Sequence, residues 1–260
     1  MSTGKPYRGV NVFLLGLTAQ AEGYTSAWWG TYRQLSELGG QVRRGEKSTL
    51  VVFWKMLHVP DRESAEGKPK IVPLLRYFRV FNAEQAAGLP ARYYPGPAAS
   101  LPVGESAEVI IKSYLTRRGS PVLARDGGDR AYYVPATDMI HLPADGAFDS
   151  VAERYSTTFH EMGHSTGHKS RLNRPGIAQI DHFGSDQYSR EELAAEMTSA
   201  MLCAVSAVET DASFANSAAY IRGWLKALRA DAKLAVVAAG QAQRACDHIT
   251  DVTYADTESA

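Results

Sequence analysis

The chain has 260 residues, with 28 acidic and 28 basic side chains. Hydrophobic residues make up 45% of it and charged residues 22%, a composition that excludes an intrinsically disordered chain. Its longest apolar stretch is too short to cross a bilayer, and it contains only two cysteines, Cys203 and Cys246. A membrane partner and a disulfide scaffold are therefore excluded, and we expect a soluble protein of a reducing, cytoplasmic compartment.

Charge is unevenly distributed along the chain. Residues 1–95 carry 13 Lys and Arg against 7 Asp and Glu, whereas residues 96–260 carry 15 against 21. Between the two halves, Pro90–Pro102 contains four prolines, as linkers often do. We therefore expect two modules, of which the first favours a polyanion.

In chain order, the pattern first predicts a small α+β module. Helices are expected over Gly9–Glu22 and over a short segment that opens with the capping-box pattern Thr31–Gln34. Two β-rich stretches follow, Ser48–Leu57 and Val72–Asn82, and the polar break Pro60–Lys70 between them is typical of a solvated loop.

The second half predicts helices around a short antiparallel sheet, so the expected fold class is α+β. Three strands are expected, at Val122–Arg125, Ala131–Pro135 and Met139–Leu142. The expected helices are Glu105–Arg118, Phe148–His164, Arg190–Ala207, Ser213–Arg229 and Asp231–His248.

The long helix carries the motif His160-Glu161-Met162-Gly163-His164. Residues four apart project from one face of a helix, so His160 and His164 can bind one metal ion, and Glu161 can take a proton from a metal-bound water. A helix, a short sheet, a metal-binding helix and a second helix are what a zincin-type metallopeptidase core needs. The alternative is a pair of buried, hydrogen-bonded histidines on an ordinary helix.

Two histidines leave a tetrahedral zinc short of one protein ligand. Ser170 stands where the longer H-E-x-x-H-x-x-G-x-x-H pattern requires a histidine, which excludes that arrangement, and His168 follows Gly167, where the helix is expected to end. Glu192 and Glu196 lie four apart on the next helix. We choose Glu196 as the ligand and Glu192 as the carboxylate that orients a ligating histidine; the alternative for this pair is a solvated helix face.

An oxyanion formed during hydrolysis also needs a hydrogen-bond donor. Tyr188 and Tyr155 are candidates, although for each of them simple packing is the commoner role. The sequence does not distinguish Zn²⁺ from Mn²⁺ or another divalent cation as the native metal.

Further motifs occur in a fixed order along the chain. They are Tyr7–Asn11, Trp29–Gln34, Leu38–Lys47, Val80–Gln85, Tyr133–Asp138, His160–Gly167, Ser170–Arg174 and Glu191–Glu196. Only the H-E-x-x-H element is generic, and the whole set resembles the ArdC family of antirestriction proteins, which is borne on plasmids and other mobile elements. The resemblance implies a single-stranded-DNA-binding domain at 1–92, a Pro-rich linker at 93–102 and a zincin-like metallopeptidase domain at 103–255.

The N-terminal residues fit this implied DNA binding. Lys and Arg bind phosphates and aromatic rings stack on bases, and residues 1–55 hold seven Lys and Arg against three acids, interleaved with aromatic residues. The residues expected to contact DNA are Tyr7, Arg8, Asn11, Trp29, Tyr32, Arg33, Arg43, Arg44 and Lys47. The alternative is that the tryptophans belong to the core and the arginines only increase solubility.

The expected function is therefore antirestriction: the protein binds single-stranded DNA, carries a zinc-dependent peptidase site and protects incoming mobile-element DNA. The alternative is a non-catalytic protein that coats the strand and has a structural or vestigial metal site. Glu161 favours the enzyme, because a purely structural zinc would not need it. A domain detached from a primase is a weaker alternative, since no catalytic cluster of acids is visible.

Overall fold

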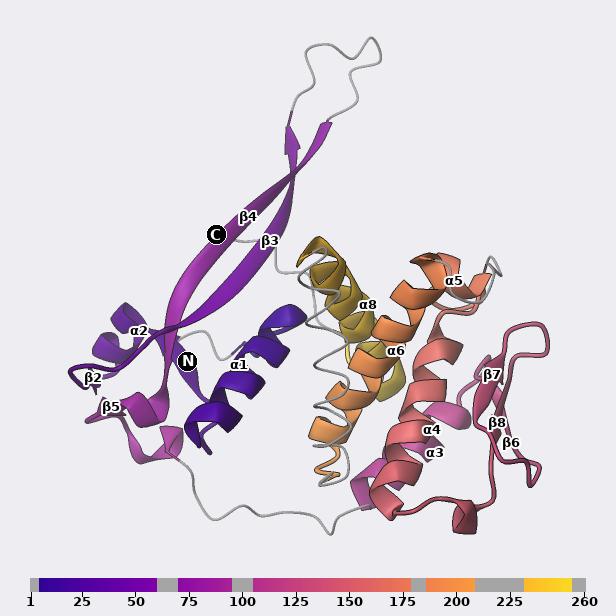
Figure 1. The fold of residues 1–260 in the computed structure, drawn as a ribbon. Helices are drawn as coiled ribbons and strands as arrows, with labels where there is room; N and C mark the ends of the chain where they lie inside the picture. Colours follow the sequence, from indigo (N-terminus) through magenta and orange to yellow (C-terminus); the bar gives the residue numbers. More distant parts are fainter. Residues whose placement is uncertain (1–4, 60–69, 95–104, 179–185, 209–231, 254–260) are drawn as a thin grey trace. The chain divides into compact units, whose positions relative to one another are not determined.

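The computed structural model describes residues 5–59, 70–94, 105–178, 186–208 and 232–253. The chain divides into two compact units, Met1–Ala98 and Ala99–Ala260, and this division falls inside the predicted linker. Each unit is described by itself (Figure 1). The predicted α+β class is confirmed. The helix predicted at 213–229 and the loop predicted at 60–70, apart from Lys70, lie outside the described residues.

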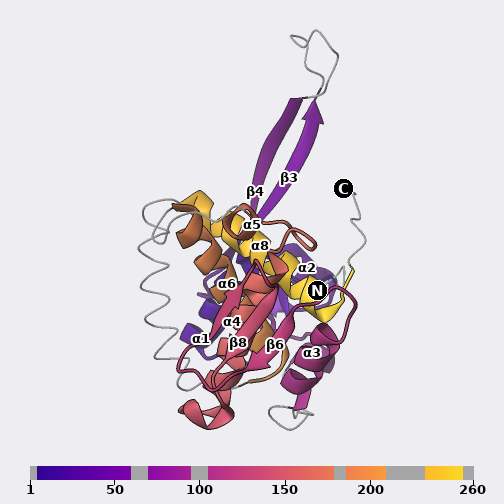
Figure 2. The same ribbon diagram turned by 90° about the vertical axis from the view of Figure 1, so that its right-hand side faces the viewer.

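One long hairpin dominates the sheet of the first unit. Strands β1 (Trp29–Thr31), β4 (Lys70–Asn82) and β3 (Thr49–Val59) form an antiparallel sheet in that order. The β3–β4 hairpin projects well beyond the helices of its unit (Figures 1 and 2). A smaller antiparallel pair joins β2 (Gln41–Val42) to β5 (Ala86–Ala87).

The two helices of this unit have the end signals that the sequence predicts. Helix α1 (Val10–Glu22) ends at Gly23, whose φ of 73° is left-handed and therefore favours glycine. Helix α2 (Tyr32–Glu37) opens with the predicted capping box. The Thr31 hydroxyl accepts from the Gln34 amide at 3.2 Å, while the Gln34 side chain accepts from the Thr31 amide at 2.9 Å.

Two clusters of buried side chains form the core of the first unit. The first consists of Leu15, Trp29, Val51 and Val80 and holds α1 against the sheet. The second gathers α2 with the two 3₁₀ turns, η1 (Ala83–Gln85) and η2 (Ala91–Tyr93). It consists of Leu35, Ala83, Ala86, Leu89 and Tyr93.

The second unit is layered, with the small sheet against α4, α4 against α6, and α6 against α8 (Figures 1 and 2). Its helices are α3 (Glu105–Leu115), α4 (Val151–Thr166), α5 (Pro175–Ala178), α6 (Asp186–Val205) and α8 (Ala232–Thr250), with a 3₁₀ turn η3 at Asp145–Ala147. Helix α4 begins three residues later than predicted because the Ser150 hydroxyl caps it, accepting from the Glu153 amide at 3.0 Å. In the described residues, no helix is long and apolar enough to cross a membrane.

The three strands of the second unit occur where the sequence predicts them, but their sheet is mixed. Strands β6 (Val122–Arg125), β8 (Met139–Leu142) and β7 (Tyr132–Val134) pair in that order. β7 and β8 form an antiparallel hairpin, and Asp138 in its turn has a φ of 51°. β8 lies between the other two strands and runs parallel to β6.

Asn11 joins α1 to the outer edge of the hairpin. Its side chain is 5% exposed, and its amide donates to the Val52 carbonyl and accepts from the Val52 N–H, both at 2.7 Å. The side chain thus satisfies two backbone groups of β3 as a neighbouring strand would.

We expect Asn11→Ala to lower the free energy of unfolding by about 1–3 kcal/mol, because it leaves a backbone donor and acceptor of Val52 without partners. The measurement is urea unfolding followed by circular dichroism. Gln20→Ala, at an exposed position of the same helix, is the control and should change stability by less than about 0.5 kcal/mol. Equal effects of the two substitutions would contradict this role of Asn11.

Candidate functional site

The candidate metal centre lies where α4 and α6 come closest. A Cβ atom added to Gly163 on α4 would lie 3.2 Å from the Ala195 Cα and 3.3 Å from the Thr198 Cβ on α6. The glycine therefore permits a close approach of the two backbones. This approach brings carboxylates in the N-terminal half of α6 within reach of His160 and His164.

Three side chains converge between the two helices. The Nε2 atoms of His160 and His164 are 3.0 Å apart, and each lies 3.5 Å from an oxygen of Glu192. Two ligands about 2.0–2.1 Å from a tetrahedral zinc would lie about 3.3 Å from each other, so the three groups fit one ion. In the described part of the chain they are the one set of three or more His, Cys, Asp or Glu residues placed to share a metal.

Two further carboxylates contact the opposite side of the imidazoles. Glu196 Oε1 lies 3.2 Å from His160 Nδ1, and Glu191 Oε1 lies 3.3 Å from His164 Nδ1. An ionised carboxylate only accepts hydrogen bonds, so each Nδ1 carries the proton and each Nε2 keeps its lone pair for a metal. This geometry favours Glu192 as ligand and Glu196 as the orienting group, the reverse of the choice made from sequence. The rotation of α6 about its axis decides between them.

Arg174 holds Glu191 in place. Its guanidinium, in a side chain 5% exposed, donates to Glu191 Oε2 at 2.9 Å and to Oε1 at 2.5 Å. It also donates to the Thr166 hydroxyl at 2.6 Å and to the Gly163 carbonyl at 2.7 Å. Sequence reasoning assigned no role to Arg174 or Glu191; their place in the Ser170–Arg174 and Glu191–Glu196 motifs was the available signal.

The charges of the site favour a cation. Burial alone would lower the pKa of His160, but hydrogen bonds to Glu192 and Glu196 raise it to about 10. The pKa of His164 is also raised against the effect of burial, by Glu191 and Glu192. Burial would raise the pKa of Glu192, but the two histidines hold it well below its usual range. Without a metal, the raised pKa therefore keeps His160 protonated at neutral pH.

Glu161 is buried beside the ligand group, with 6% of its surface exposed. Burial raises the pKa of its carboxyl, and the neighbouring His164 and His160 only partly oppose that shift. A carboxyl with a raised pKa is a better proton acceptor and donor near neutral pH.

Two of the other sequence candidates have partners outside the ligand group. His168 Nδ1 contacts the Ser170 hydroxyl at 2.7 Å. The Tyr155 hydroxyl donates to Glu108 at 3.1 Å, so it is already used between α4 and α3. Tyr188 lies in the first turn of α6, and its side chain is outside the described part of the structure.

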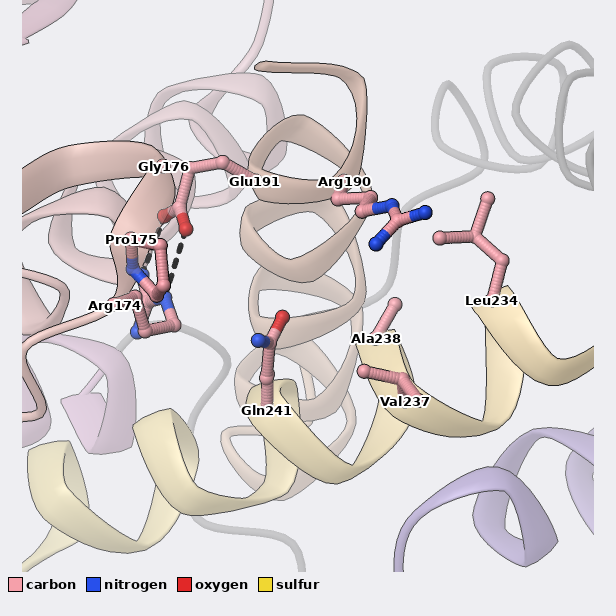
Figure 3. Close-up of a pocket in the computed structure, with 9 residues that line it drawn as sticks. All are labelled: Arg174, Pro175, Gly176, Arg190, Glu191, Leu234, Val237, Ala238 and Gln241. Atoms are coloured by element: carbon pink, nitrogen blue, oxygen red, sulfur yellow. Dashed lines mark hydrogen bonds and ion pairs between the residues drawn. The ribbon is translucent and has the colours of Figure 1, made fainter. Parts of the chain in front are cut away.

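A pocket of about 180 Å³ is bounded by the Arg174–Glu191 ion pair (Figure 3). Residues from α5, α6 and α8 line it, and the three converging side chains do not. The pocket is therefore distinct from the candidate metal centre.

The structure buries two of the nine residues predicted to contact DNA. Asn11 is engaged by Val52, and Trp29 is 4% exposed in the first core cluster, 5.9 Å from the ring of Tyr24. Both side chains therefore maintain the fold. This arrangement corrects their assignment as DNA contacts, because a base cannot stack on a ring inside the core.

The other seven residues lie at least partly at the surface: Tyr7, Arg8, Tyr32, Arg33, Arg43, Arg44 and Lys47. Two of their positive charges are already paired, Arg33 with Glu37 at 2.8 Å and Arg43 with Glu46 at 2.7 Å. Arg44 forms no ion pair with any residue that the structure describes. Of the neighbouring Arg43 and Arg44, both expected to contact DNA, only Arg43 therefore has its charge compensated.

Both units match known families. Residues 1–81 match the N-terminal domain of anti-restriction factor ArdC, and residues 114–241 match a zincin-like metallopeptidase family. The uncharacterized protein y4eC of Sinorhizobium fredii is 37% identical over 95% of this chain and 78% of its own length. Two Escherichia coli proteins, both DNA primase TraC, are 35% and 37% identical over 95% of this chain, which spans only 17% and 23% of their lengths.

Two crystal structures share the fold of this chain. They are the metal-free and the Mn(II)-bound forms of the antirestriction protein ArdC from the R388 plasmid, with TM-scores of 0.71 and 0.70. Both are 40% identical to this chain and are matched over 96% of it and 86% of their own length. The chain belongs to the ArdC family of antirestriction proteins.

Proposed function

We propose that this protein binds single-stranded DNA through its N-terminal unit, carries a metal-dependent peptidase site in its C-terminal unit and protects incoming mobile-element DNA from host restriction. The observation that carries the enzymatic part is the convergence of His160 Nε2, His164 Nε2 and the Glu192 carboxylate beside the buried Glu161. The buried free thiols of Cys203 and Cys246 fit action in a reducing cytoplasm.

His160, His164 and Glu192 would hold the metal, while Glu196 and Glu191 keep the two imidazoles oriented. Two nitrogen donors and one carboxylate suit Zn²⁺, and the Mn(II)-bound relative makes Mn²⁺ the second candidate. When bound, such an ion acts as a Lewis acid and lowers the pKa of a coordinated water.

Glu161 supplies the proton transfer. Its carboxylate accepts the proton of the attacking water and returns it to the leaving amine of a peptide or protein substrate. Burial of Glu161 raises its pKa, which makes uptake of the proton from the water more favourable at neutral pH.

The second candidate function is protection by coating the strand, without catalysis. One observation argues against a purely structural metal: this chain matches the metal-free and Mn(II)-bound relatives with nearly equal TM-scores, 0.71 and 0.70. The likeness of this chain to that relative is therefore the same whether or not the relative holds Mn(II). Coating remains sufficient in principle, since a covered strand is hidden from a nuclease.

Glu161→Gln should abolish cleavage of a peptide library while leaving bound metal and DNA affinity unchanged, because the amide keeps the shape of the side chain but accepts no proton. We expect at least about a 100-fold loss of rate. Cleavage, metal content and electrophoretic mobility shifts are measured on the same preparations. Unchanged cleavage would refute the role of Glu161, and antirestriction that survives in cells would favour the coating function.

Glu192→Ala should weaken metal binding more than Glu196→Ala does. Removal of a group that only orients a ligand typically costs about 10–100-fold in affinity, whereas loss of the ligand itself costs more. Competition with a chelator measures both variants against the unsubstituted protein. The opposite order of effects would restore Glu196 as the ligand.

Metal affinity should fall as pH is lowered from 8 to 6, by about 10- to 100-fold per unit, because metal and protons compete for the histidines. The sign follows from the raised pKa of both histidines, about 10 for His160, because each then holds its proton more tightly and a metal must displace it. Calorimetry in buffers of different ionisation enthalpy counts the protons released. An affinity independent of pH, with no proton release, would contradict this competition.

A further inference from the structure

Strand β4 exposes four consecutive side chains directly before the buried Val80. Arg76, Tyr77, Phe78 and Arg79 are all exposed, Tyr77 by 69% and Phe78 by 43%. Successive side chains on a strand point to opposite faces, so one of every two is normally buried in a core. Here one face includes Val51, which is paired with Phe78 and is buried, yet Phe78 itself and its neighbours Arg76 and Phe53 on that face are exposed.

Each face of the hairpin combines an aromatic ring with an arginine. On one face, Phe53 lies opposite Arg76 in the β3–β4 ladder, and the Phe53 and Phe78 rings meet edge to face at 5.3 Å. On the other face, Tyr77 is paired with Val52, and Arg79 is next to it on that face. Phe53 is itself 47% exposed, so the rings remain open to a ligand.

The positive charge of this surface is not compensated nearby. Neither strand contains an Asp or a Glu. Within the described residues, Arg76 forms no ion pair, and the guanidinium of Arg79 contacts the Ser48 hydroxyl at 3.4 Å. Ser48 is preceded by the exposed Lys47, so positive charge continues from the base of β3 onto the hairpin. A second copy of the chain bound through this face would bring like charges together, which disfavours self-association.

We propose that the β3–β4 hairpin is the surface that binds single-stranded DNA: bases stack on Tyr77 and on the Phe53–Phe78 pair, and Arg76 and Arg79 pair with phosphates. This inference rests on the proposed DNA binding and assigns it to residues that the sequence did not suggest. Single strands are preferred because only unpaired bases offer free faces to these rings. The exposed hairpin residues thus replace Asn11 and the buried Trp29 as the proposed DNA contacts.

The test measures the affinity of the full chain for a fluorescent oligothymidine by anisotropy. Tyr77→Ala should weaken binding by about 5- to 100-fold, the effect of losing one stacked base. Arg76→Gln and Arg79→Gln should each reduce the slope of log affinity against log salt by about 0.7, the value of one phosphate contact on a single strand. Circular dichroism melting checks that each variant is folded.

Matched controls come from the other unit: Tyr132→Ala and Arg130→Gln remove an exposed tyrosine and an exposed arginine there and should leave DNA affinity unchanged. If the unsubstituted protein does not bind the oligothymidine, the proposed DNA-binding function fails. If it binds but the hairpin variants bind equally well, the function stands and the hairpin assignment is refuted. If Tyr77→Ala abolishes a dimer in sedimentation without changing DNA affinity, the face is a self-association surface and the inference is overturned.

Discussion

The close approach of α4 and α6 at Gly163 is the constraint on which the metal centre depends. A side chain at this position would meet the Ala195 backbone at 3.2 Å, and the helices could then separate only by carrying Glu192 and Glu196 away from the histidines. The Gly163 carbonyl also accepts from Arg174 at 2.7 Å. One small residue therefore sets the helix spacing and contributes to the anchoring of the arginine.

The balance of charge explains why such a cluster needs a cation. Four carboxylates, those of Glu161, Glu191, Glu192 and Glu196, surround the histidines, and Arg174 neutralises one of them directly. Buried charges are costly unless they are paired. The remaining negative charge can be balanced by protons on the imidazoles or by a divalent ion. The raised pKa of each histidine and the proposed affinity for a metal thus have one electrostatic origin.

Local patterns in the sequence were sufficient for the elements and for the two histidines. The Thr31–Gln34 capping box, the strand positions and the H-E-x-x-H helix depend on residues close together in the chain. Glu192 could not be separated from Glu196 in this way, because the rotation of α6 is fixed by its packing on Gly163. The parallel pairing of β6 with β8 likewise depends on contacts between segments that are separated in the chain, which strand propensity does not predict.

Composition also could not predict which aromatic and polar side chains near the N-terminus are buried and which are exposed. Asn11 and Trp29 belong to recognisable motifs. However, the Asn11 side chain bonds to the backbone of Val52, and the Trp29 ring is buried in the core. Tyr77 is exposed because it lies on the face of the hairpin opposite the buried Val51 and Val80. Since each unit has its own buried core, substitutions at Tyr77 and at Glu161 test the proposed strand binding and the proposed hydrolysis separately. Restriction resistance measured on both variants would therefore reveal which activity the protection requires.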